Sequence, residues 1–254
     1  MHPAAVADPE AAPQGEPAPP AIAIQSSVAS RLKRADFARE QASGDARHLA
    51  DWVVDSGDNL GKSFVIIDKA NARIFVFETG GLIRGAAPVL LGSARGDHTV
   101  PGIGEKKLSA VRAAERTTPA GRFVASVGRN FRGEDVVWVD YDSAVSMHPV
   151  IRTKDRLQRL ASAAVKDRRV SYGCINVPAA FYAAVVLPAF TGTEGIVYVL
   201  PEIRSMAEVF GSYDVDERSA RPPFRRTQRS SGHNGAERLP KRLREGLMRR
   251  CRGI

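Results

Sequence analysis

Short runs of β-branched and aromatic residues, closely spaced along the middle of the chain, constrain the fold most. The first two runs, Phe64–Ile67 and Ile74–Phe77, are separated by a short segment that begins Asp-Lys-Ala-Asn, whose Asp and Asn suit a tight turn. Further runs at 86–91, 123–127, 136–141, 144–148 and 195–200 predict more strands. Because so few residues separate the early runs, they favour an antiparallel meander over strand–helix–strand units. We therefore expect a mainly β domain with a few short helices.

The helical patterns are few and short. Apolar residues at 157, 160, 161 and 164 recur with helical spacing, and Thr153 stands near their start as a cap. A second short helix is predicted from Pro178 to Pro188. Residues 28–52 indicate one helix or two, broken near Gly44. The polar, glycine-containing stretch 93–115 is long for a loop in a compact domain and indicates a functional or mobile segment.

Composition divides the 254 residues into four predicted regions: an Ala/Pro-rich disordered leader (1–27), a helical region (28–62), the main domain (63–215) and a basic disordered tail (216–254). Residues 218–254 carry a net charge of +10, whereas the whole chain carries +9. The residues before 218 are therefore nearly neutral in sum. This distribution argues against a folded basic groove and against specific nucleic-acid binding. No apolar run approaches the ~20 residues that cross a bilayer. The leader lacks the pattern of a secretory signal peptide.

The segment from Ser171 to Asn176, Ser-Tyr-Gly-Cys-Ile-Asn, carries the strongest chemical signal. We expect it between a loop and a helix start, with the Cys174 thiol at an exposed junction. A thiolate attacks acyl carbons, and a nearby imidazolium or polarised backbone lowers the pKa of the thiol. Gly173 permits close backbone approach, and N–H groups around Cys174 suit a developing oxyanion. The alternative is that Cys174 is a small buried apolar residue. With only one other cysteine in the chain, a disulfide-rich scaffold and a four-cysteine zinc site are excluded.

The wider pattern resembles the catalytic domain of the L,D-transpeptidase (YkuD-like) family. That family's signature is a histidine, a spacer, then Ser/Thr-His-Gly-Cys, an apolar residue and Asn or Arg. In this chain His148 takes the place of the upstream histidine, and the later positions are matched by Ser171, Gly173, Cys174, Ile175 and Asn176. The sequence Thr-Pro-Ala-Gly at 118–121 resembles a turn that usually precedes the family's catalytic strands. The resemblance covers roughly 63–201 and implies a β-sandwich.

The resemblance also implies an activity and a set of roles. Cys174 would form a thioester with a peptidoglycan stem peptide, and His148 would shuttle protons while the Pro149 carbonyl fixes its ring. The backbone N–H groups of Gly173 and Cys174 would hold the oxyanion. No metal or cofactor is implied. The family works in the periplasm or cell envelope, in cell wall biogenesis and cell shape.

The chain departs from the family's pattern in substrate positioning. Tyr172 stands where the family has a histidine, and the interval between His148 and Cys174 is long enough for a helix forming a lid or wall. We assign substrate contacts to Tyr172 and to four further residues. These are Ser171, Asn176, Arg168 and Arg169. For the basic residues of the interval the alternative is a solvated helix face.

Two other functions remain open on the sequence alone. The same site with water as acceptor would make a hydrolase of wall peptides, a carboxypeptidase or endopeptidase. A non-catalytic wall-binding module is the alternative from another class, and Tyr172 is the feature that favours it. The basic tail suits an anionic wall polymer or a membrane surface, or it is an extension without a role.

Overall fold

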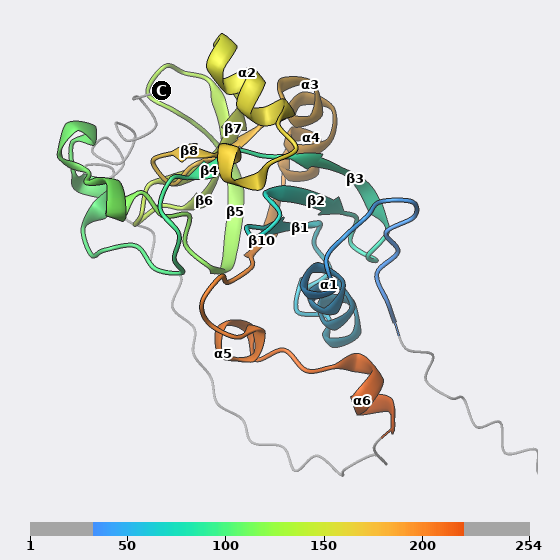
Figure 1. The fold of residues 1–254 in the computed structure, drawn as a ribbon. Coiled ribbons are helices and arrows are strands. Elements are labelled where there is room, and N and C mark those ends of the chain that lie inside the picture. The colour runs from blue at the N-terminus through green and yellow to red at the C-terminus, as the bar shows by residue number, and fades with distance from the viewer. Residues whose placement is uncertain (1–32, 221–254) are drawn as a thin grey trace, which may run out of the picture. The chain divides into compact units, whose positions relative to one another are not determined.

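The computed structural model describes residues 33–220, and its main feature is a sheet of eight strands in the order β3-β2-β1-β10-β5-β6-β7-β9, with β4 and β8 paired separately (Figure 1). The strands are β1 (Phe64–Asp68), β2 (Arg73–Phe77), β3 (Ile83–Pro88), β4 (Leu91–Gly92), β5 (Gly121–Arg129), β6 (Asp135–Asp140), β7 (Val145–Pro149), β8 (Arg169–Ser171), β9 (Ile175–Val177) and β10 (Glu194–Val199). The helices are α1 (Gly44–Ser56), α2 (Lys154–Ala161), α3 (Ala179–Phe181), α4 (Leu187–Phe190), α5 (Met206–Phe210) and α6 (Val215–Ala220). The prediction of a mainly β fold with a few short helices is confirmed. The predicted leader, and all of the predicted tail beyond residue 220, lie outside the described residues.

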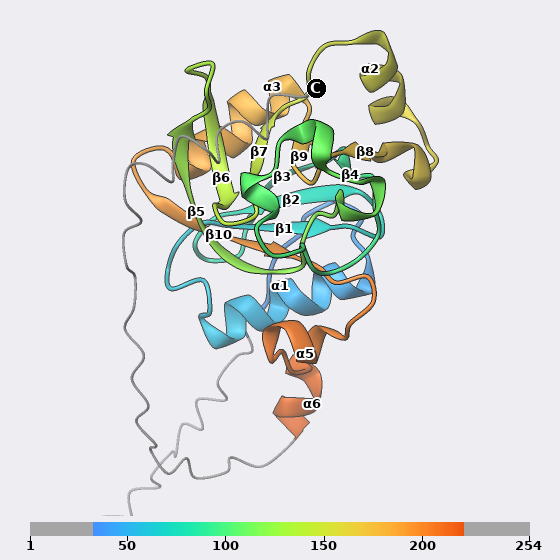
Figure 2. The ribbon, with the colours of Figure 1, turned by 90° about the vertical axis from the view of Figure 1, so that its left-hand side faces the viewer.

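Successive side chains of the first strands point to opposite faces of the sheet, and both faces are covered by buried apolar clusters. In β1, Phe64 and Ile66 face an aromatic cluster on one side, while Val65 and Ile67 face the core on the other. That core also receives Val137 of β6, from the other half of the sheet. The sheet therefore packs on itself as the layers of a sandwich do. Figure 2 shows α1 on the opposite side of β1 from α2 and α3.

The expected meander is present only in part. The strands β1, β2 and β3 follow one another antiparallel, but β1 also pairs parallel with β10, and β7 pairs parallel with β9. The two ends of the sheet meet where Leu90 and Asn176 exchange backbone hydrogen bonds of 2.9 and 2.8 Å. This closure brings the segment after β3 against β9.

Of the helical prediction over 28–52, residues 28–32 lie outside the described residues, and the remainder holds only from Gly44 onward. In α1, the Ser43 hydroxyl accepts a hydrogen bond from the Ala46 N–H and caps the start, and Gly57 in the left-handed conformation ends the helix. The described residues before α1 are not helical. Asp36 instead exchanges backbone hydrogen bonds with the Gly81 carbonyl and the Ile83 N–H. Pairing with the sheet edge thus replaces helix formation there.

Both later helices differ in extent from their predictions. Thr153 caps α2 as expected, but the helix ends at Ala161, and its buried residues are Arg156 and Leu160. Leu157, expected on the apolar face, is 42% exposed. The helical segment from Ala179 does not stop at Pro188 but continues to Phe190, because a π-helical turn (η5, Tyr182–Val186) puts the proline in the first turn of α4.

The long polar stretch folds into three short 3₁₀ turns, η1 (Ile103–Glu105), η2 (Leu108–Ala110) and η3 (Ala113–Glu115). A fourth, η4 (Val165–Arg168), precedes β8. Buried Glu115 ties the stretch together through ion pairs of 2.9 Å with Lys106 and with Arg112. Its pKa falls from 4.5 to about 2, because the Lys106 and Arg112 side chains donate hydrogen bonds to the carboxylate. Within residues 33–220, no helix is both long enough and apolar enough to span a membrane.

Candidate active site

The parallel pairing of β7 with β9 brings together residues that are far apart in the sequence. In this register His148 lies opposite Asn176, and Met147 opposite Ile175, the residue after Cys174. The connection between the two strands runs through α2 and β8. As a result, the His148 imidazole makes a side-chain hydrogen bond with Cys174.

The His148 ring is oriented by its own strand. Its Nδ1 lies 2.9 Å from the backbone carbonyl of Pro149. A carbonyl only accepts hydrogen bonds, so we assign a proton to Nδ1, which leaves Nε2 to face the thiol. The carbonyl of Pro149 therefore lies where the resemblance implied.

The electrostatics of His148 favour its charged form. Burial lowers the pKa of this imidazole, but the hydrogen bond with Cys174, the charge of its thiolate and the Pro149 carbonyl outweigh burial. The net direction is a pKa above the ordinary 6.5. Arg156, whose positive charge acts against the imidazolium, is a smaller opposing influence. An imidazolium beside a thiolate is the pair that nucleophilic cysteines use.

Cys174 is buried, which corrects the expectation of an exposed junction. Only 3% of the residue is exposed, and it lies between β8 and β9 rather than at a helix start. Its Sγ lies 3.7 Å from the Ala144 carbonyl and 3.8 Å from the Ser146 hydroxyl. The pairing of β9 with β7 places Cys174 against the start of β7, which covers the thiol. The surroundings are nevertheless polar, unlike those of a purely apolar core cysteine.

Ser171 closes the turn that carries the cysteine. Its hydroxyl donates to the Cys174 carbonyl at 2.6 Å and accepts from the Gly173 N–H at 3.1 Å. Ser171, expected to contact substrate, is fully buried, and the Gly173 N–H, expected to hold the oxyanion, donates to the Ser171 hydroxyl in this structure. Gly173 itself adopts φ +130°, a conformation that favours glycine.

Asn176, expected to bind substrate, is fully buried and connects Arg156 to the cysteine turn. Its Oδ1 accepts a hydrogen bond of 2.7 Å from Arg156, so its amide nitrogen faces the other way. That nitrogen donates to the Cys174 carbonyl at 3.2 Å and lies 3.5 Å from the Nε2 of His148. The sequence reasoning missed Arg156. The only sequence signal for Arg156 was its spacing of four residues from Leu160, which places both on the same, inward-facing side of α2.

Arg168 and Arg169, expected to contact substrate, both hydrogen-bond to other parts of the chain. Arg168 donates to the Ser162 carbonyl at 2.6 Å. Arg169 pairs with Glu202 and donates to the Lys69 carbonyl at 2.9 Å. Both residues are partly buried, Arg168 at the end of η4 and Arg169 at the start of β8.

Tyr172 is half-buried, and the guanidinium of Arg116 lies over its ring, 4.1 Å from the centroid. This cation–π contact links the cysteine turn to the end of the long polar stretch. The sequence reasoning did not single out Arg116, because stacking between distant segments has no local signal.

A cavity of about 350 Å³ gives access to the histidine. Its lining comes from the end of β7 and from the hairpin between β5 and β6, namely Asn130, Arg132, Glu134, Asp135, Val136, His148, Pro149, Val150 and Ile151. A molecule in this cavity can therefore reach His148. In the part of the chain that the structure describes, no three His, Cys, Asp or Glu residues are grouped to hold a metal ion.

Several solved structures share limited similarity with the chain, three of which follow. The L,D-transpeptidase LdtMt1, solved with imipenem, is 19% identical with a TM-score of 0.33, over 54% of this chain and 58% of that one. The catalytic domain of the Enterococcus faecium L,D-transpeptidase is 18% identical with a TM-score of 0.31, over 55% and 98% of the two chains. The helical cell shape determining protein Pgp2 of Campylobacter jejuni is 14% identical with a TM-score of 0.37, over 63% and 52%.

No protein-family model and no curated protein matches the chain significantly. TM-scores below 0.5 do not establish a common arrangement, so the case for a function rests on the residues of the site. The chain spans 58% of the length of LdtMt1 and 52% of that of Pgp2.

Proposed function

We propose that the protein is a cysteine acyltransferase of the L,D-transpeptidase type, acting on peptidoglycan stem peptides in the periplasm or cell envelope. The observation that carries the proposal is the hydrogen bond between buried His148 and Cys174, with the ring oriented by the Pro149 carbonyl. The raised pKa of His148 supports the same assignment, because a charged imidazole stabilises a thiolate.

The reaction has two acyl-transfer steps. The Cys174 thiolate attacks the carbonyl that joins the diamino acid of a donor stem to its terminal D-residue, forming the S–C bond. The C–N bond then breaks, and the leaving amine takes a proton from the His148 imidazolium. In the second step an acceptor amine attacks the thioester, gives its proton to His148 and releases the thiolate. The cavity lined by His148 gives the acceptor a route to the imidazole.

The first experiment asks whether Cys174 is an acylated nucleophile. The protein is incubated with a carbapenem, and its intact mass is measured. We expect one covalent adduct in the wild type and in Cys251→Ser, and none in Cys174→Ala. In His148→Ala acylation should slow by about 10²–10⁴-fold, the usual contribution of a positioned acid–base group. A wild type without an adduct, both with the drug and with a tetrapeptide stem, contradicts the proposal and favours a binding module.

A second experiment separates transfer from hydrolysis. A tetrapeptide stem is supplied with and without an amine acceptor, and the products are identified by mass spectrometry. We expect the cross-linked product when the acceptor is present. If only the shortened stem forms, at the same rate with and without acceptor, the enzyme is a hydrolase.

A further inference from the structure

Thr118 connects the cysteine turn to the rest of the molecule through one buried hydroxyl. The residue is fully buried, and its Oγ1 accepts a hydrogen bond of 2.9 Å from the Gly92 N–H. The same oxygen lies 2.8 Å from the carbonyl of Gly173. Because the Gly92 N–H can only donate, the hydroxyl proton of Thr118 points at the Gly173 carbonyl.

This contact determines the plane of the peptide bond that precedes the nucleophile. The peptide between Gly173 and Cys174 is trans and planar, so its carbonyl and its N–H point in opposite directions. Holding the carbonyl toward Thr118 therefore directs the Cys174 N–H away from Thr118. Glycine at 173 is free to rotate, so this peptide would flip easily without a fixed partner.

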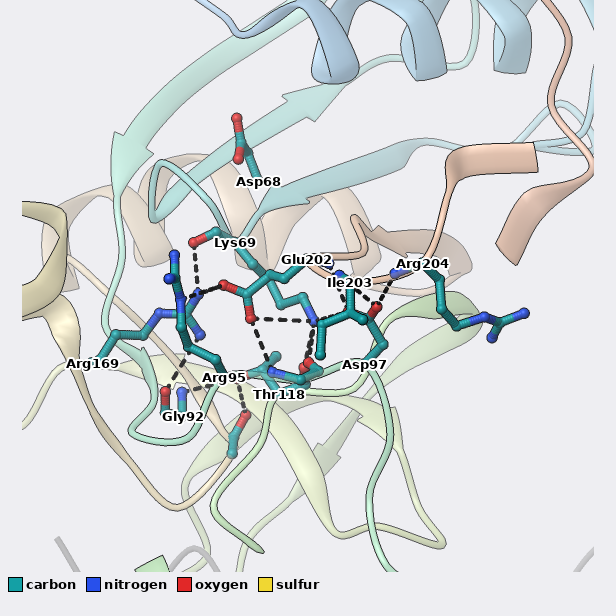
Figure 3. A network of polar contacts seen from close by, with 12 residues as sticks. Asp68, Lys69, Gly92, Arg95, Asp97, Thr118, Arg169, Glu202, Ile203 and Arg204 are labelled. Carbon is teal, nitrogen blue, oxygen red and sulfur yellow. Dashed lines mark hydrogen bonds and ion pairs between the residues drawn. The ribbon is translucent and has the colours of Figure 1, made fainter. Parts of the chain in front are cut away.

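The backbone of Thr118 is itself anchored by a buried ion cluster, shown in Figure 3. The Lys69 ammonium donates to the Thr118 carbonyl at 3.1 Å, to the Gly96 carbonyl at 2.6 Å and to Asp97 at 3.0 Å. These three acceptors use all three of its protons. Lys69 and Asp97 are both almost completely inaccessible to solvent. Because the buried ion cluster fixes the backbone of Thr118, it also fixes the position of the Thr118 hydroxyl.

We propose that Thr118 is a positioning residue of the acyl-transfer reaction, which holds the Gly173–Cys174 peptide so that the Cys174 N–H faces the oxyanion of the tetrahedral intermediate. The inference rests on the proposed function. It also takes account of the Gly173 N–H, which donates to the Ser171 hydroxyl. The oxyanion forms when the S–C bond is made and the electron pair of the C=O bond moves onto oxygen. A donor already oriented toward that oxygen costs no reorganisation.

The experiment compares two reactions of the same sulfur. Carbapenem acylation passes through an oxyanion, whereas alkylation by iodoacetamide displaces iodide from a saturated carbon and forms none. In Thr118→Val, which removes the hydroxyl and keeps the shape, we expect the acylation rate to fall about 10²-fold. Alkylation of Cys174 should stay within about twofold of the wild type. Thr118→Ser, which keeps the hydroxyl, should restore acylation.

A measurement on the wild type keeps the test independent of any folding defect in the variant. A peptide aldehyde forms a tetrahedral thiohemiacetal with Cys174, and its oxygen should shift the Cys174 amide proton downfield in the NMR spectrum. An unshifted amide overturns the inference. So does acylation of Thr118→Val at the wild-type rate, or an equal loss of acylation and alkylation. A wild type that is alkylated but never acylated contradicts the proposed function itself.

Discussion

At the scale of single residues, two neighbours act in opposite directions on the pKa of His148: Cys174 raises it and Arg156 lowers it. Burial lowers the pKa of this imidazole, and the interactions with Cys174 raise it. Cys174→Ala removes the raising interactions and leaves burial, so we expect the pKa of His148 to fall relative to the wild type. Arg156→Met removes an opposing positive charge, so we expect that pKa to rise. Titration of the His148 ring by NMR measures both directions.

The matched control for that titration is Arg159→Met. Arg159 lies on the same helix but pairs with Asp155 at 3.0 Å on the exposed side. Its removal should leave the pKa of His148 unchanged. An upward shift as large as that of Arg156→Met would mean that general helix charge, rather than the buried guanidinium, acts on the imidazole.

The sequence identified the site residues that are recognisable by their type and order, but not the contacts that depend on how helices and side chains are oriented. His148, Pro149 and Cys174 stood out by residue type and order, and the structure brings them together. The place of Arg156 depends on which face of α2 turns inward. The apolar pattern included buried Leu160 but also Leu157, which is exposed, and so did not define that face. The occupation of the Gly173 N–H depends on the rotamer of a serine, which no sequence pattern shows.

At the scale of elements, β4 must lie very close to the segment that leads into β5. A Cβ added at Gly92 would lie 2.3 Å from the Arg116 carbonyl oxygen and 2.8 Å from the Thr118 nitrogen. Gly92→Ala should therefore destabilise the fold by about 1–3 kcal/mol, the usual cost of overpacking. It should also slow acylation by displacing Thr118. Urea denaturation measures the first effect, with Gly80→Ala as control because nothing lies within 4 Å of its added Cβ. Equal stability of the two variants would contradict the close approach.

The long polar stretch should respond to acid through Glu115. The pKa of this carboxyl is about 2 in the folded protein and 4.5 as its ordinary value, so the charged form stabilises the fold above pH 4.5. That stability is lost as pH falls from 4.5 through 2. Glu115→Gln should therefore be less stable than the wild type at pH 7, and the difference should shrink toward pH 2. Denaturation at several pH values checks this, and a difference independent of pH would refute it.

Most of the strands were predictable, because their runs of β-branched and aromatic residues are bounded by turn residues, but β8 and β9 were not predicted. The sequence also did not predict how the strands pair. The parallel contacts of β1 with β10 and of β7 with β9 join segments separated by more than a hundred residues and by about 25 residues, respectively. Local runs hold no information on such register, and the meander inferred from them covers only β1 to β3. The active site depends on the unpredicted pairing.

At the scale of the whole molecule, one buried charge cluster joins three distant parts of the chain. Lys69 follows β1, Asp97 lies in the polar stretch, and Glu202 follows β10. Asp97 accepts backbone hydrogen bonds of 2.7–2.9 Å from the N–H groups of residues 202–204. Although its burial favours the neutral acid, these donors and Lys69 hold the pKa of Asp97 well below its ordinary value. The cluster thus fixes the carboxyl ends of the paired strands β1 and β10 beside Thr118, which supports the cysteine turn.

Removing the single lysine of this cluster should affect stability far more than removing a surface lysine. Lys69→Met leaves the Asp97 and Glu202 carboxylates buried with too little positive charge, which typically costs about 3–5 kcal/mol. Lys62→Met is the control, because Lys62 pairs with Glu194 at 3.5 Å at the surface, where a pair contributes about 0–1 kcal/mol. Adding Asp97→Asn to Lys69→Met should recover part of the loss, since it removes one of the unpaired charges. Guanidinium denaturation of the four proteins tests this, and a double variant less stable than Lys69→Met would show that Asp97 acts through its backbone donors rather than through the lysine.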